Sequence, residues 1–115
     1  MAGGITKHYA EERQERDALI KENGGYGKAV AIIKVDKGHP AGPELHVLTT
    51  NAIIAVYNEY TRKLVTMKFA RPGQIRQLTG KPNILDEGKP FYHWNIDHSI
   101  MKRAEYYEKN GMNEW

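Results

Sequence analysis

The spacing of apolar positions divides the chain into a helical segment followed by several strand-like segments. Residues 5–23 have helical spacing, Thr6 can cap their start, and Asn23-Gly24-Gly25 is a typical helix end. The β-rich runs that follow cover residues 28–36, 44–50, 51–57 and 63–69. Short connections between the last three runs predict an antiparallel meander, to which residues 28–36 add a further strand.

The remainder of the chain reads as two helices separated by a loop. Pro72 suits the first position of a short helix, and residues 79–90 form a loop rich in glycine and proline. A final helix is expected over residues 97–110, with Asn95 or Asp97 as its cap and Gly111 just after its end. The predicted class is α+β: an N-terminal helix, a four-stranded antiparallel sheet and a C-terminal helix.

Length and composition predict one domain with a modest core. The 115 residues form a single unit, in which residues 1–79 supply the helix and sheet and residues 80–115 add an aromatic loop and the C-terminal helix. Charged residues make up 27% and hydrophobic residues 40% of the chain, and no apolar run is long enough to span a bilayer. The absence of cysteine excludes disulfides and thiolate metal sites. We therefore expect a cytoplasmic protein with no membrane partner.

The basic residues are unevenly distributed along the chain. The formal net charge is only +3, but no acidic residue lies between Glu59 and Asp86. The cations of this block are Arg62, Lys63, Lys68, Arg71, Arg76 and Lys81. Such a block favours an anionic partner such as phosphate, a nucleotide or RNA, and the alternative is a solvated basic face.

The strand at residues 63–69 can present some of these cations together. Alternation assigns Val65, Met67 and Phe69 to its apolar face and Leu64, Thr66 and Lys68 to the other face. Arg71 follows the strand directly and can be either an ordinary turn residue or a ligand of an anion. A hydroxyl, an ammonium and a guanidinium in one neighbourhood suit phosphate recognition.

The first helix carries charged side chains where a buried face is expected. Glu12, Arg13 and Arg16 fall on the same stripe as Ile5 and Ile20. Arginines on a buried face predict a pocket or a subunit interface, and the alternative is that they extend past the edge of the sheet into water.

The aromatic and histidine residues supply further candidates. Phe91, Trp94 and Asn95 lie in the segment FYHWN and could stack on a base, or the aromatic rings could tie this loop to the core. The histidines are His8, His39, His46, His93 and His98. Their spacing matches no metal-binding motif, so we expect no metal and no cofactor. His39 is interpreted as a turn residue and His46 as a structural strand residue, although in an enzyme His8, His46 or His93 could serve as the general acid or base.

Two resemblances bear on function. HYAEERQER on the leading helix, followed by strands that end in TRKLVT, resembles the barnase–EndoU–colicin–RelE-like ribonucleases. This resemblance implies roles for His8 and Arg16 on the helix, for Thr66 on a late strand and for Arg71 as a phosphate ligand.

The second resemblance covers residues 44–77 and the closing helix AEYYEKNGMNEW, which look like a type of small phage and prophage protein. Proteins of this size include the Thoeris anti-defence proteins, which bind cyclic ADP-ribose signals at oligomer interfaces without catalysis. That resemblance implies a homo-oligomer in a host cytoplasm.

Together these observations predict non-catalytic binding, or sequestration, of a phosphate-bearing nucleotide or cyclic nucleotide signal. The expected phosphate ligands are Arg13, Arg16, Arg62, Thr66, Lys68, Arg71 and Arg76, with base stacking by Phe91, Trp94 and Asn95. The alternative is a metal-independent ribonuclease that uses His8, Thr66 and Arg71 on RNA.

Overall fold

The computed structural model describes residues 7–91 and 94–113, with side chains described for residues 10–91 and 98–113. The elements in chain order are α1 (Lys7–Glu22), β1 (Ala29–Val35), β2 (Glu44–Thr49), β3 (Ile53–Asn58), β4 (Leu64–Phe69), α2 (Pro72–Leu78), β5 (Pro82–Asn83), the 3₁₀ turn η1 (Ile84–Asp86), β6 (Lys89–Pro90) and α3 (Trp94–Lys109).

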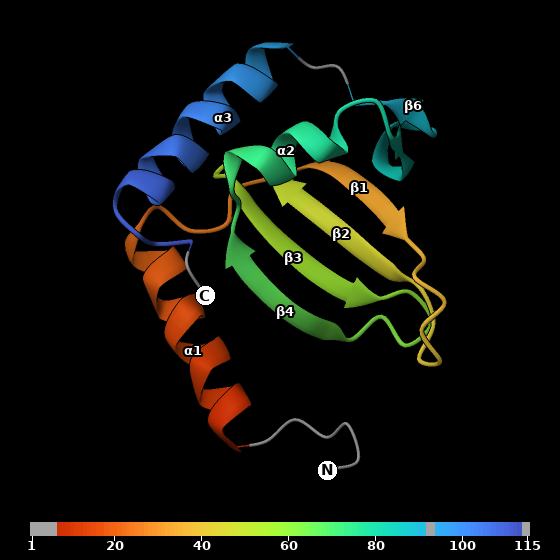
Figure 1. The fold of residues 1–115 in the computed structure, drawn as a ribbon, viewed down its shortest axis with the longest axis horizontal. Coiled ribbons are helices and arrows are strands. Elements are labelled where there is room, and N and C mark those ends of the chain that lie inside the picture. The colour runs from red at the N-terminus through yellow and green to blue at the C-terminus, as the bar shows by residue number, and fades with distance from the viewer. Residues whose placement is uncertain (1–6, 92–93, 114–115) are drawn as a thin grey trace.

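The main sheet is an antiparallel meander in the order β1-β2-β3-β4, as Figure 1 shows. The predicted α+β class is therefore confirmed, with helices at both ends of the chain. The final helix begins earlier than expected, at Trp94, so that Asn95 and Asp97 lie within it rather than capping it. The predicted loop over residues 79–90 includes the short β5–β6 pair and η1.

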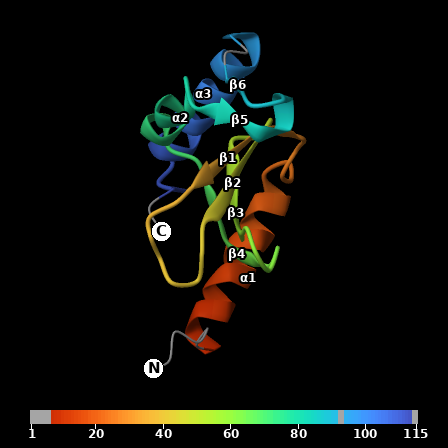
Figure 2. The same ribbon diagram turned by 90° about the vertical axis from the view of Figure 1, so that its right-hand side faces the viewer.

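The helices lie on both sides of the sheet. In Figure 2, which shows the sheet nearly edge-on, α1 lies on one side and α2 on the other. One continuous core joins Ile20 of α1, Ile75 of α2 and Tyr107 of α3 to the strands. The hydroxyl of Tyr107 also donates to Asn51 O at 2.8 Å, in the turn between β2 and β3. The C-terminal helix is thus part of the same core as the sheet.

The free edge of β4 is covered by the two arginines of α1. Arg16 Nη1 donates to Met67 O at 3.0 Å and to Thr66 Oγ1 at 3.3 Å. Arg13 Nη1 lies 3.3 Å from both Leu64 O and Val65 O. In the structure both arginines donate to the backbone of an edge strand, with Arg16 buried and Arg13 half-buried. A buried edge carbonyl needs a donor, and a guanidinium on a long stem can reach it from the helix.

At the opposite edge of the sheet, an amide side chain pairs with the backbone of β1. Asn83 is 1% exposed, accepts from Ile32 N at 2.8 Å and donates to Val30 O at 3.0 Å. This side chain therefore completes the backbone pairing of β1 and attaches the segment after α2 to the sheet.

The contacts of Arg16 predict a loss of stability when its guanidinium is removed. Arg16→Met keeps the apolar stem but leaves Met67 O without this donor, so the free energy of unfolding should fall by about 1 to 3 kcal/mol. Urea unfolding followed by circular dichroism measures this change. Arg76→Met, at an exposed site on α2, is the matched control and should change stability by less than about 0.5 kcal/mol. Equal unfolding midpoints for the two variants would contradict the role of Arg16.

Candidate functional site

The side of the sheet that carries α2 has two adjoining pockets. The loop pocket, of about 660 Å³, lies between the sheet and the loop of residues 37–42 that connects β1 to β2. The lysine pocket, of about 320 Å³, lies between the sheet and α2. Val35 and Lys37 line both pockets, so the two pockets adjoin, and together they are called the groove.

The lysine pocket gathers cations from three parts of the chain. Lys37 comes from the β1–β2 loop, Lys68 from β4 and Lys81 from the segment after α2. Gln74 and Gln77 of α2 add side-chain amides to the same lining. Ammonium groups and amides are hydrogen-bond donors, so this arrangement suits an anion with several oxygen atoms.

Lys68 is held in a position that disfavours its own charge. Its pKa is lowered from the ordinary lysine value, first by desolvation and then by the positive charges of Lys37, Arg71 and Arg16, while Glu44 opposes this shift. Like charges around a partly buried ammonium raise its free energy until an anion neutralises them. A perturbed lysine in a pocket with other cations is a typical feature of a binding site for an anion.

The local structure explains how Lys68 and Arg71 come together. The register pairs Val56 with Thr66 and Ile54 with Lys68, which places Thr66 and Lys68 on one face of β4 as the alternation predicts. Pro72 then ends the strand and starts α2, and the backbone N–H of Arg71 donates to Gln74 Oε1 at 2.9 Å. Arg71 thereby stays at the end of β4, near Lys68.

The predicted apolar face of β4 is wrong at one position. A β-bulge shifts the register between Val56 and Tyr57, and Val65 lines the loop pocket instead of pointing the same way as Met67 and Phe69. A bulge inserts an extra residue into a strand and breaks its period of two, which alternation alone does not reveal.

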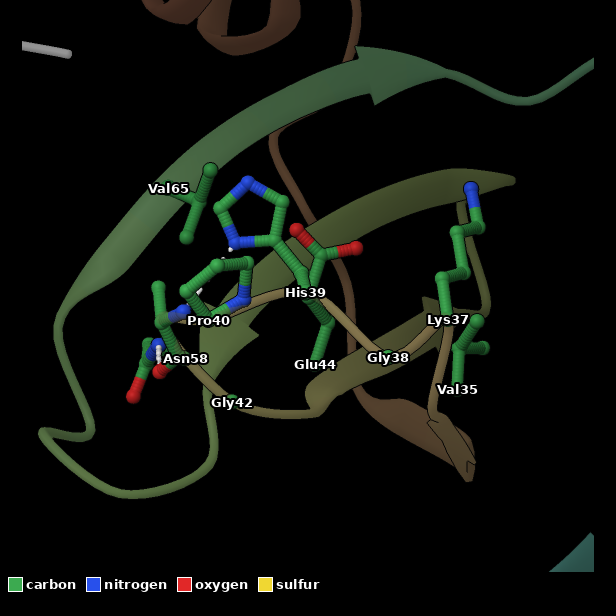
Figure 3. A pocket seen from close by; sticks show the side chains of 10 residues that line it. Val35, Lys37, Gly38, His39, Pro40, Gly42, Glu44, Asn58 and Val65 are labelled. Atoms are coloured by element: carbon green, nitrogen blue, oxygen red, sulfur yellow. Dashed lines mark hydrogen bonds between the residues drawn. The ribbon is translucent and has the colours of Figure 1, made fainter.

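The loop pocket is closed on one side by the β1–β2 loop, which is fixed to the sheet. Asn58 Nδ2 donates to Ala41 O at 2.8 Å. Within the loop, the N–H of Ala41 donates to His39 Nδ1 at 3.1 Å, and Figure 3 shows the imidazole lying between Val65 and Glu44. His39 is thus a turn residue, as expected, but it also lines the pocket. The glycine- and proline-rich sequence KGHPAGP between two strands was the signal for this long loop.

A histidine–carboxylate pair lies where the two pockets meet. His46 Nε2 and Glu44 Oε1 are 3.1 Å apart, with His46 lining the lysine pocket and Glu44 lining the loop pocket. Sequence reasoning interpreted His46 as structural and did not single out Glu44. Glu44 and His46 are two residues apart on β2, so their side chains lie on one face of the strand. This spacing in the sequence could have indicated the pair.

The other predicted phosphate ligands lie apart from this groove or are already engaged. Arg13 and Arg16 bind the edge of β4, and Arg16 also donates to the hydroxyl of Thr66. Arg62 is an exposed residue at φ 62° in the turn before β4, at the opposite end of that strand from Arg71. Arg76 is exposed on α2, with Nη1 4.0 Å from Met101 Sδ. Lys68 and Arg71 are the predicted ligands that the fold brings together.

The predicted stacking residues differ in their placement. Phe91 is 0% exposed and belongs to the core, so its ring presents no face to a ligand in this structure. Trp94 and Asn95 begin α3, and their side chains lie outside the described part of the chain, as does the side chain of His8.

Comparisons with known proteins give no relative for this chain. No family model matches it, and no curated protein or solved structure matches it either. Among the described residues, no group of three histidine, cysteine or acidic side chains is placed to hold a metal, and no helix there could cross a membrane. Function must therefore be inferred from the groove itself.

The environment of Lys68 predicts that removing its charge stabilises the fold. The pKa of Lys68 is lower in the folded than in the unfolded chain, so the charged lysine costs stability at neutral pH. Lys68→Met should therefore raise the melting temperature at pH 7. This advantage should shrink as the pH rises towards 10.5, because the wild-type lysine then becomes neutral.

Differential scanning calorimetry at several pH values measures this difference. Lys63→Met, at an exposed lysine in the turn before β4, is the control and should leave the melting temperature nearly unchanged. A lower melting temperature for Lys68→Met at pH 7 would refute the electrostatic cost.

Proposed function

We propose that this protein binds and sequesters a phosphate-bearing nucleotide or cyclic nucleotide, with the phosphate in the lysine pocket. The observation that carries the proposal is the position of Lys68, which is partly buried beside other cations. Placing the Lys68 ammonium in a partly buried site beside other cations costs free energy, and a bound anion offsets this cost. Charged groups with perturbed pKa values are concentrated at functional sites.

The chemistry of the lining supports phosphate over other anions. Lys37, Lys68 and Lys81 supply three positive charges, and Gln74 and Gln77 supply neutral donors for further oxygens. A phosphate group carries more charge and more acceptor oxygens than a carboxylate, so it makes better use of this set. The guanidinium of Arg71 adds positive charge nearby, although its Nε already donates to Asn113 O at 2.9 Å.

The state of the predicted catalytic groups supports holding the ligand over cleaving it. The hydroxyl of Thr66 accepts a hydrogen bond from Arg16, and Arg71 is tied to the C-terminal segment through Asn113. A binding protein of this size also agrees with the resemblance to anti-defence proteins, in which a signalling nucleotide is sequestered.

One observation favours ribonuclease activity as a second candidate. His46 lies in the lysine pocket with Glu44 at 3.1 Å, and a carboxylate that orients an imidazole is a common arrangement for a general base. In this alternative, His46 rather than His8 would remove the proton from a ribose hydroxyl while Lys68 stabilises the phosphate charge.

Isothermal titration calorimetry with pyrophosphate, AMP and cyclic ADP-ribose tests the binding proposal. The wild-type protein should bind at least one of these compounds, and Lys68→Met and Lys37→Met should each weaken binding about tenfold or more, because each removes a charge-assisted contact. Lys63→Met is the control, and its affinity should equal that of the wild type. No measurable binding of any of the three compounds would contradict the proposal.

Incubation with total RNA separates the two candidates. Sequestration leaves the RNA intact, and this is the expected result. Discrete cleavage products that disappear in His46→Ala would instead establish the ribonuclease candidate. Circular dichroism of His46→Ala confirms that a loss of cleavage is not a loss of fold.

A further inference from the structure

The groove continues from the lysine pocket into a second compartment with different chemistry. Val35 and Lys37 line both pockets, so the loop pocket is the compartment that adjoins a phosphate bound at Lys68. The loop pocket has apolar walls formed by Val35, Pro40 and Val65. A charged compartment next to an apolar one matches the two ends of a nucleotide.

We propose that the loop pocket binds the nucleobase of the ligand and that the imidazole of His39 is its stacking surface. This inference rests on the proposed function, because the phosphate in the lysine pocket fixes the direction in which the nucleoside extends. Figure 3 shows the His39 ring over the sheet, between Val65 and the carboxylate of Glu44. Histidine is among the side chains on which bases stack.

A hydrogen bond within the loop restricts the orientation of the exposed His39 ring. Its Nδ1 accepts from the N–H of Ala41 at 3.1 Å, which requires Nδ1 to be unprotonated and leaves Nε2 as the donor in the neutral ring. Asn58 fixes the same loop by donating to Ala41 O. A ring that is already positioned loses little conformational entropy when a base stacks on it.

The loop conformation also depends on close packing at Gly42. This residue has φ +102°, and a Cβ atom there would lie 2.5 Å from the ring of Tyr60. A side chain at this position would displace either Tyr60 or the loop. The backbone conformation of the loop at this position therefore favours glycine.

Glu44 gives the loop pocket a preference among bases. Its carboxylate lines the pocket beside the His39 ring, and one of its oxygens is paired with His46. A carboxylate accepts hydrogen bonds from an amino group and repels a carbonyl oxygen. Bases with an exocyclic amino group, such as adenine and cytosine, should therefore bind better than hypoxanthine and uracil.

The stacking role is tested by calorimetric titration with pyrophosphate, ribose 5-phosphate and AMP. For the wild-type protein, AMP should bind about tenfold more tightly than ribose 5-phosphate, since base stacking contributes on this scale. His39→Ala should remove this advantage and leave pyrophosphate affinity unchanged, whereas His39→Phe should retain it because the ring is kept.

The role of Glu44 is tested with two pairs of nucleotides that differ in one group. AMP should bind more tightly than IMP, and CMP more tightly than UMP. Glu44→Gln should abolish both preferences without weakening pyrophosphate binding, because it removes a negative charge close to Lys68. Preferences that survive in Glu44→Gln would overturn the assignment of this carboxylate.

The outcomes for the two proposals are distinguishable. Equal affinities of the wild-type protein for AMP and ribose 5-phosphate, with pyrophosphate still bound, would overturn the base compartment and leave the phosphate site standing. Equal losses of AMP and pyrophosphate affinity in His39→Ala would also overturn the stacking role. If no phosphate compound binds, both proposals fall.

Discussion

The fold depends on how the two outer strands of its sheet satisfy their backbone hydrogen bonds. A four-stranded sheet has two edges, and each unpaired carbonyl or N–H that is buried there costs free energy. The protein covers the β4 edge with Arg13 and Arg16 of α1 and the β1 edge with Asn83. These side chains come from α1 and from the segment after α2, so their hydrogen bonds to the strand edges join both segments to the sheet.

Part of one face of the sheet carries the two adjoining pockets. α1 lies on the other side, and the short α2 lies on the face that carries the groove. The remaining space is bounded by the β1–β2 loop. A hydrogen bond from Asn58 to Ala41 O attaches this loop to the sheet, and Gly42 lies close to the ring of Tyr60. The groove therefore follows from the lengths of α2 and of this loop. The acid-free block contributes Lys68 and Lys81 to its lining, and the β1–β2 loop contributes Lys37.

Arginine and lysine have separate tasks in this protein. The arginines of α1 donate to fixed backbone acceptors, for which a planar guanidinium with several donors is suited. In the groove, Lys68 is partly buried and the positive charge of Lys37 acts on it. Desolvation and this repulsion lower the pKa of Lys68. The sequence alone does not distinguish these cations, and this explains why arginines that donate to the backbone of β4 were predicted as phosphate ligands together with Lys68.

The sequence by itself determined the class of the fold, the order of its strands and the face of Lys68, because these depend on local periodicity and on short turns. It also determined that Arg71 ends β4 next to a proline-initiated helix. Only the tertiary structure decided that Phe91 is in the core, that Val65 leaves the apolar face and that Arg13 and Arg16 bind a strand edge. It alone also brought His39 and Glu44 into one groove with Lys68. Those placements depend on contacts between residues distant in sequence, and hydrophobic spacing carries no information about which distant groups will meet.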